Sequence, residues 1–135
     1  MSKRTPETKA EPPIEPEEKP VEWVGSSRED LKSFPRPVRA SVGESLYRAQ
    51  TGQRADGTKI MKGFGGAGVI EIIEDHDGST YRAVYTVKFR DVVYVLHCFQ
   101  KKSKSGIETP KHVIDRIKKN LKRAEDHYKE RSGGT

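Results

Sequence analysis

Cysteine is almost absent from this sequence, since Cys98 is the only one among 135 residues. A disulfide within the chain is therefore impossible. Long apolar runs are also missing: the run Val-Val-Tyr-Val-Leu at residues 92–96 has the length of a strand, whereas a membrane helix needs about 20 apolar residues. Because the chain also begins without the apolar segment of a signal peptide, we expect a cytoplasmic protein that is not bound to a membrane.

Apolar residues are scarce in the first twenty positions, where only Met1, Ala10 and Ile14 are apolar. Five of the eight prolines lie in the same segment, interleaved with glutamate and lysine. Such a segment cannot bury enough apolar surface to offset the entropy that it would lose on ordering. We therefore predict a disordered polar tail over residues 1–20 and one folded domain over residues 21–132.

Acidic residues are fewer than basic ones, which gives the chain a formal charge of +6 and a pI near 9.4. The excess is concentrated near the end, where residues 101–131 hold eleven Lys or Arg against five Asp or Glu. A small basic domain has an electrostatic reason to bind a polyanion such as nucleic acid. A solvated surface without such a partner is the alternative that composition leaves open.

The first half of the domain carries the patterns of one strand and two helices. Residues 21–24 alternate apolar and polar side chains, as a half-buried strand does. Ser26 and Glu29 have the spacing of a capping box, which predicts a helix over residues 27–34 that ends at two prolines. Apolar residues at every fourth position then predict a second helix over residues 37–50.

Three strand patterns follow a glycine-rich segment, residues 51–68, that is typical of a loop. We predict the strands at residues 69–74, 80–89 and 92–99, with an Asp-Gly hairpin turn between the first two. In the middle strand Arg82 lies on the polar face, opposite a face of aromatic and small apolar residues. The last strand is apolar on both faces, as a central strand is.

The C-terminal segment predicts a long helix. Thr109 suits a cap, Pro110 suits the first helical position, and apolar residues from Ile114 to Tyr128 recur at alternating spacings of three and four. Lysines and arginines lie outside that apolar face. The predicted fold is therefore α+β, with a small antiparallel sheet, an N-terminal helical hairpin and a C-terminal helix.

Two of these strands resemble those of the RelE/ParE toxin superfamily, and above all its HigB-like, phage-derived branch. The stretch Tyr-Arg-Ala-Val-Tyr at residues 81–85 is similar to one strand of that group. The stretch Leu-His-Cys-Phe-Gln-Lys-Lys-Ser at residues 96–103 is similar to the end of the next strand. The likeness extends over about residues 21–129.

This resemblance implies a toxin of a type II toxin-antitoxin system. It implies an endoribonuclease that cuts mRNA, acts on the ribosome, uses no metal or cofactor, and is neutralised by an antitoxin, often a helix-turn-helix protein. Two alternatives stay open, because fold alone does not fix activity. One is a non-enzymatic toxin of the same fold that inhibits DNA gyrase, and the other is a degenerate phage-derived binding protein.

RNA cleavage through the ribose 2′-OH needs a base, cations that stabilise the phosphorane, and an acid for the leaving 5′ oxygen. The resemblance assigns Arg82 to the phosphorane, because Arg and Lys act well where negative charge develops. Lys101 and Lys102 end the central strand, and neighbouring cations would lower the pKa of a lysine enough for it to act as a base. His97, whose ordinary pKa is near 6.5, is a further acid-base candidate.

Other residues are candidates for contacts to RNA rather than for chemistry. Lys59 and Lys62 precede the hairpin strands, and Lys118 and Lys119 lie on the basic face of the last helix. Tyr94 is the aromatic residue that we select for base stacking. The four histidines and single cysteine show no metal-ligand spacing, so the sequence predicts no metal site.

Overall fold

The computed structural model describes residues 18–66, 68–101 and 109–132. The tail predicted over residues 1–20 lies outside this part of the chain, except for its last three residues. Lys102, one of the predicted catalytic lysines, also lies outside the described residues.

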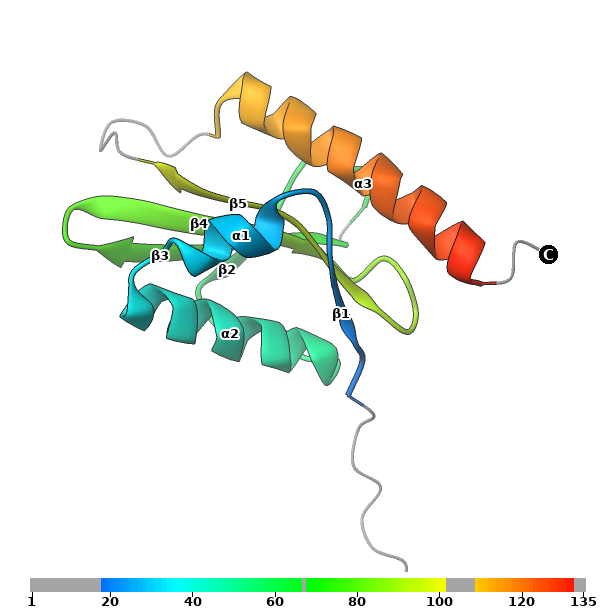
Figure 1. Cartoon of the computed structure of the whole chain (residues 1–135), viewed down its shortest axis with the longest axis horizontal. Coiled ribbons are helices and arrows are strands. Elements are labelled where there is room, and N and C mark those ends of the chain that lie inside the picture. The colour runs from blue at the N-terminus through cyan, green and yellow to red at the C-terminus, as the bar shows by residue number, and fades with distance from the viewer. Residues whose placement is uncertain (1–17, 67, 102–108, 133–135) are drawn as a thin grey trace, which may run out of the picture.

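The described residues form an α+β fold with one sheet between two helical layers (Figure 1). In chain order the elements are β1 (Val21–Trp23), α1 (Ser27–Lys32), α2 (Arg36–Gln50), β2 (Thr58–Ile60), β3 (Val69–His76), β4 (Ser79–Thr86), β5 (Val93–Lys101) and α3 (Lys111–Arg131). The helices α1 and α2 cover one face of the sheet, and α3 covers the other (Figure 1). The predicted helical hairpin and C-terminal helix are thus confirmed.

The sheet has the strand order β1-β5-β4-β3-β2. Its pairs are antiparallel except for β1, which lies parallel to β5 with Val21 opposite Val93. The predicted antiparallel arrangement of the three strands β3, β4 and β5 is confirmed, and β1 adds a parallel pair that the sequence did not predict.

The strand β2 lies inside the segment that we predicted to be a loop. It has three residues and pairs with β3 at the edge of the sheet, where Lys59 lies opposite Glu71. Three residues are too few to show an alternating pattern, so this strand depends on its pairing with β3. The pairing fixes Lys59 on the same face as Glu71.

Each face of the sheet carries its own apolar core. On the α1 and α2 side, Tyr81, Ala83 and Tyr85 of β4 pack with α2. The opposite face of β4, which we predicted to be the polar one, is covered by α3, so that Arg82, Val84 and Thr86 are buried as well. Phe89 ends the strand that we predicted over residues 80–89, but β4 ends at Thr86 and Phe89 belongs to the α3 core.

An irregularity in β5 positions the end of that strand. Val84 lies opposite His97 and Tyr85 lies opposite Val95, so Leu96 is an extra residue in β5 and forms a β-bulge. The backbone carbonyl of Leu96 accepts a hydrogen bond of 2.7 Å from Nδ2 of buried Asn120. This bond ties the middle of α3 to the bulge.

None of the three helices that the structure describes qualifies as a membrane span, because each is too short or too polar.

Candidate functional site

Arg82 and Glu71 form a buried ion pair on the α3 face of the sheet. Nη1 of Arg82 lies 3.2 Å from Oε2 of Glu71, and the two side chains are 6% and 1% exposed. The hydroxyl of Thr109 lies 3.4 Å from Arg82 Nη1 and 3.4 Å from Glu71 Oε2. An alcohol oxygen is therefore held between a carboxylate and a guanidinium.

The pairing of the strands explains why these side chains meet. Glu71 lies opposite Val84 across the β3–β4 hairpin, so Glu71 and Arg82 are diagonal neighbours on one face. Thr109 directly precedes the first turn of α3. A buried charge is stable only with a partner that offsets its desolvation, and here the partners are two residues of one hairpin.

A surface cavity of about 330 Å³ opens beside this ion pair. It is lined by Lys59, Met61, Lys62, Glu71, Thr109 and Ile114. The side chains of Lys59 and Lys62 are exposed, whereas Glu71 is buried in the wall. The cavity thus combines two cations at an open edge with a carboxylate that is paired to a guanidinium.

The structure brings Arg82 together with the predicted RNA contacts Lys59 and Lys62, through Glu71. Sequence reasoning missed Glu71, although a signal was present: it is the one charged residue in the run Val-Ile-Glu-Ile-Ile, residues 69–73. A carboxylate inside an apolar strand is costly to bury and therefore predicts a buried cation or a functional role.

Lys101 lies close to Arg82 in the sheet but does not line the cavity. Arg82 pairs with Phe99 and Thr80 pairs with Lys101, so Lys101 is on the same face as Arg82, one pleat nearer the hairpin turn. Its side chain is half-buried. The catalytic roles proposed for Lys101 and Lys102 stay predictions from the sequence.

Comparison with known proteins identifies the family of this chain. Residues 29–122, more than two thirds of the chain, match the family described as phage-derived protein Gp49-like. The chain belongs to the Gp49-like family. This match confirms the phage-derived character that the two strand motifs predicted. None of the curated proteins matches this Gp49-like chain in sequence.

One solved RelE toxin shares the fold of this Gp49-like chain. A mutant of the Escherichia coli toxin RelE in the free state is 17% identical, with a TM-score of 0.51, and the match covers 78% of this chain and 96% of that one. The isolated E. coli RelE toxin is 18% identical, with a TM-score of 0.49 and coverages of 75% and 97%. The RelBE2 toxin-antitoxin complex of Mycobacterium tuberculosis gives 20% identity, a TM-score of 0.43 and coverages of 63% and 93%.

His97 of this Gp49-like chain lies away from the cavity. Its half-buried ring stacks on Phe99, with ring centroids 5.2 Å apart and planes 19° apart. Burial lowers the pKa of His97 below its usual 6.5, the charge of Arg116 lowers it further, and Asp30 opposes both. His97 is therefore neutral near pH 7, and its surroundings favour a packing role over acid-base chemistry.

The lowered pKa of His97 predicts a loss of stability in mild acid. The folded state resists protonation of this ring more than the unfolded state does. The contribution of His97 to the free energy of unfolding is therefore complete above about pH 6.5, and it is lost as the pH falls through the pKa of the folded state. Denaturant unfolding of the wild type and of His97→Gln should show a smaller drop in stability between pH 7.5 and pH 5 for the variant. Equal drops in the two proteins would contradict the lowered pKa.

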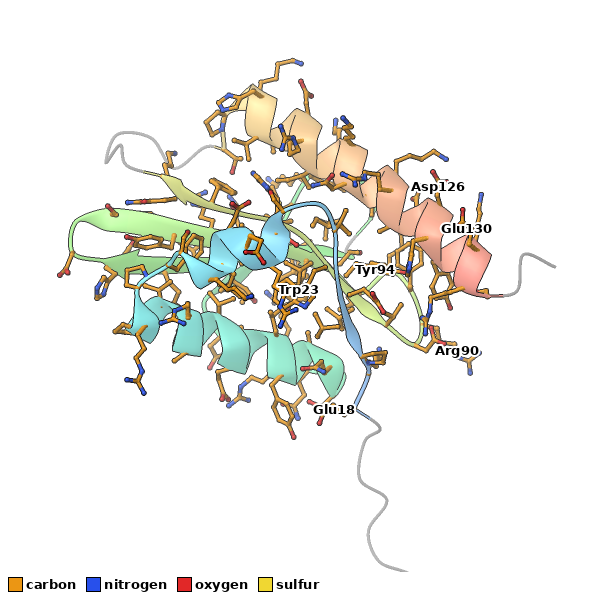
Figure 2. The ribbon with its side chains drawn as sticks, in the orientation of Figure 1. Glu18, Trp23, Arg90, Tyr94, Asp126 and Glu130 are labelled. Carbon is orange, nitrogen blue, oxygen red and sulfur yellow. The ribbon has the colours of Figure 1, made fainter. Side chains whose placement is uncertain are left out.

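The remaining candidates have separate locations. Tyr94 is 1% exposed, and its hydroxyl lies 2.7 Å from Nδ1 of His127, so its ring belongs to the core and does not offer a face for base stacking. Figure 2 shows Tyr94 beneath the C-terminal half of α3. Lys118 lies 5.9 Å from the centre of the Phe64 ring, and Lys119 is exposed on α3. In the described ranges no three His, Cys, Asp or Glu side chains form a group able to hold a metal ion.

Proposed function

We propose that this protein is the toxin of a type II toxin-antitoxin system and an endoribonuclease that cuts mRNA. The observation that carries the proposal is the buried pair of Glu71 and Arg82 beside the lysine-edged cavity. Membership of the Gp49-like family and the fold shared with the RelE toxin support it. The strand stretches around Arg82 and Lys101 are the ones that resemble the RelE/HigB toxins.

Glu71 is the base in the proposed reaction. Its carboxylate takes the proton of a ribose 2′-OH, and the 2′ oxygen then attacks the neighbouring phosphorus. Glu71 is suited to this because it already holds the hydroxyl of Thr109 at 3.4 Å. The sequence predicted a lysine for this role, but Lys101 does not line the cavity, whereas Glu71 does.

Arg82 stabilises the negative charge that accumulates on the phosphorane. As the bond from phosphorus to the 5′ oxygen breaks, an acid protonates that oxygen, and Lys101 and Lys102 are the candidates that we retain for this step. The products are a 2′,3′-cyclic phosphate and a 5′-hydroxyl end. The proton taken by the base and the one given by the acid balance.

Lys59 and Lys62 hold the flanking phosphates in this proposal. Each phosphate contact to single-stranded RNA releases counterions, so the logarithm of the binding constant falls with the logarithm of salt by about 0.7 per contact. Lys59→Ala and Lys62→Ala should each reduce that slope by about 0.7 in RNA-binding titrations. Lys32→Ala, which removes an exposed lysine of α1 on the opposite face, is the matched control. Unchanged slopes in both cavity variants would rule out these contacts.

The partners in the proposal are a cognate antitoxin, of the helix-turn-helix kind, and the translating ribosome in the cytoplasm. The experiment is to induce the wild type in cells, with and without the protein encoded by the adjacent reading frame, and to map the 5′ ends of transcripts. Growth arrest with new cuts, both suppressed by the neighbouring protein, is the expected result. Arrest with intact transcripts and loss of DNA supercoiling would support gyrase inhibition instead, and absence of arrest would support a degenerate protein.

A further inference from the structure

A second cavity lies between β1 and the C-terminal half of α3, away from the Glu71 and Arg82 pair. It has a volume of about 240 Å³, and its lining includes Glu22, Val24, Gly25, Tyr94, Arg123 and His127. Arg123 follows Ile114, which lines the first cavity, by nine residues, so these two lining residues are roughly 13.5 Å apart along the helix axis.

Glu22 and Arg123 bring opposite charges to this cavity without neutralising each other. Among the described residues, neither side chain forms an ion pair. Nη1 of Arg123 donates instead to Oδ1 of Asn120 at 3.3 Å, while Nδ2 of Asn120 is bound to the Leu96 carbonyl. The guanidinium is thus held in place by a buried amide that is itself fixed.

The backbone beside Arg123 is built to allow its close approach. Gly25 has φ of +57°, a conformation that side chains other than glycine rarely adopt. A Cβ atom at this position would lie 3.4 Å from Nη1 of Arg123. A glycine here therefore provides both the turn after β1 and the space in which the guanidinium lies.

His127 forms a further polar wall of the cavity. The Tyr94 hydroxyl is 2.7 Å from Nδ1 of His127, and burial raises the pKa of Tyr94, so the phenol keeps its proton. When that hydroxyl donates to Nδ1, the hydrogen of the ring is on Nε2, which is then a donor. The ring itself is exposed.

We propose that this cavity binds an unpaired guanine base of RNA, with Glu22 and Arg123 reading its edges. A carboxylate accepts from the N1–H and the 2-amino group, and an arginine donates to O6 and N7, the two guanine acceptors that its paired N–H groups match. Adenine keeps N7 but lacks O6, the N1–H and the 2-amino group, so Glu22 loses both of these donors and Arg123 loses one of its two acceptors. This inference rests on the proposed function, because the proposed function makes RNA the ligand.

The direct test is a titration of the full chain with GMP, AMP, CMP and UMP. Binding is monitored through the NMR signals of the His127 ring. We expect GMP to bind at least ten times more tightly than AMP, since one good base-reading pair gives about 1–3 kcal/mol of discrimination. Glu22→Gln should weaken GMP binding at least tenfold, and inosine monophosphate, which lacks the 2-amino group, should bind more weakly than GMP. The matched control is Asp126→Asn, on the outer side of α3 in Figure 2, which should bind GMP as the wild type does.

Equal affinities for the four nucleotides, no response of His127, or unchanged GMP binding by a folded Glu22→Gln would overturn the proposal. Binding of GMP by a chain that cuts no RNA would support the guanine site and would contradict the proposed nuclease activity. Two further measurements on Glu22→Gln identify the source of the base. A changed sequence preference of the cuts points to mRNA, and weaker sedimentation with ribosomes at unchanged preference points to ribosomal RNA.

Discussion

Replacement of Arg82 by Met is expected to lower the free energy of unfolding by about 3–5 kcal/mol, because it leaves the Glu71 carboxylate buried without a compensating charge. Both side chains are almost fully buried, at 6% and 1% exposure, so solvent does not screen the loss. Loss of toxicity in this variant alone would therefore say little about catalysis.

A double variant separates the structural role of the pair from the chemical one. Arg82→Met combined with Glu71→Leu removes both charges, and replacement of a buried ion pair by apolar residues of similar size is often neutral or stabilising. Denaturant unfolding should show that the double variant recovers most of the lost stability. It should nevertheless cut no RNA. If the double variant were as unstable as the single one, the ion pair would not be the source of the loss.

Glu71→Gln is expected to reduce the single-turnover rate of RNA cleavage by about 10²- to 10⁴-fold, which is the usual contribution of a positioned general base. The glutamine amide keeps an oxygen that can accept from Arg82, so the variant should lose only about 1–3 kcal/mol of stability. Rates are to be compared at a temperature where unfolding curves show both proteins folded.

The control for this variant is Glu74→Gln, which removes a carboxylate from the same strand. Glu74 accepts a hydrogen bond from Ser41 of α2, on the other side of the sheet. The Glu74→Gln variant should therefore cut RNA at the wild-type rate. A folded Glu71→Gln that cuts RNA at the wild-type rate would exclude Glu71 as the base.

The sequence predicted the helices and strands that have a regular pattern of apolar residues or a characteristic turn. The apolar repeat of α3, the alternation in β4 and the Asp-Gly turn each depend on local spacing, which fixes periodicity and turn geometry within one element. It did not predict β2 or the parallel partner of β5, because both depend on pairing between segments that are distant along the chain.

The candidate site was predicted in part for the same reason. The alternation of β4 and the resemblance pointed to Arg82, but only the register of β3 against β4 places Glu71 beside it. Tyr94 was selected for stacking because the sequence does not show which face of its strand is covered. The position of α3 over that strand, with His127 against the hydroxyl, could not be derived from the pattern. Contacts between elements decide which side chains meet, and these contacts leave little trace in local spacing.

The chemistry of the cut ends tests the central claim most directly. Purified wild type and Glu71→Gln are to be incubated with ribosomes translating a defined mRNA, and the new 3′ and 5′ ends are to be analysed. We predict a 2′,3′-cyclic phosphate and a 5′-hydroxyl from the wild type, the same ends formed at least about 100-fold more slowly by Glu71→Gln, and no cut when a single 2′-deoxy nucleotide replaces the one before the scissile phosphate. New 5′-phosphate ends, or cleavage of the deoxy-substituted mRNA at the same position, would contradict attack by the ribose hydroxyl and with it the proposed roles of Glu71 and Arg82.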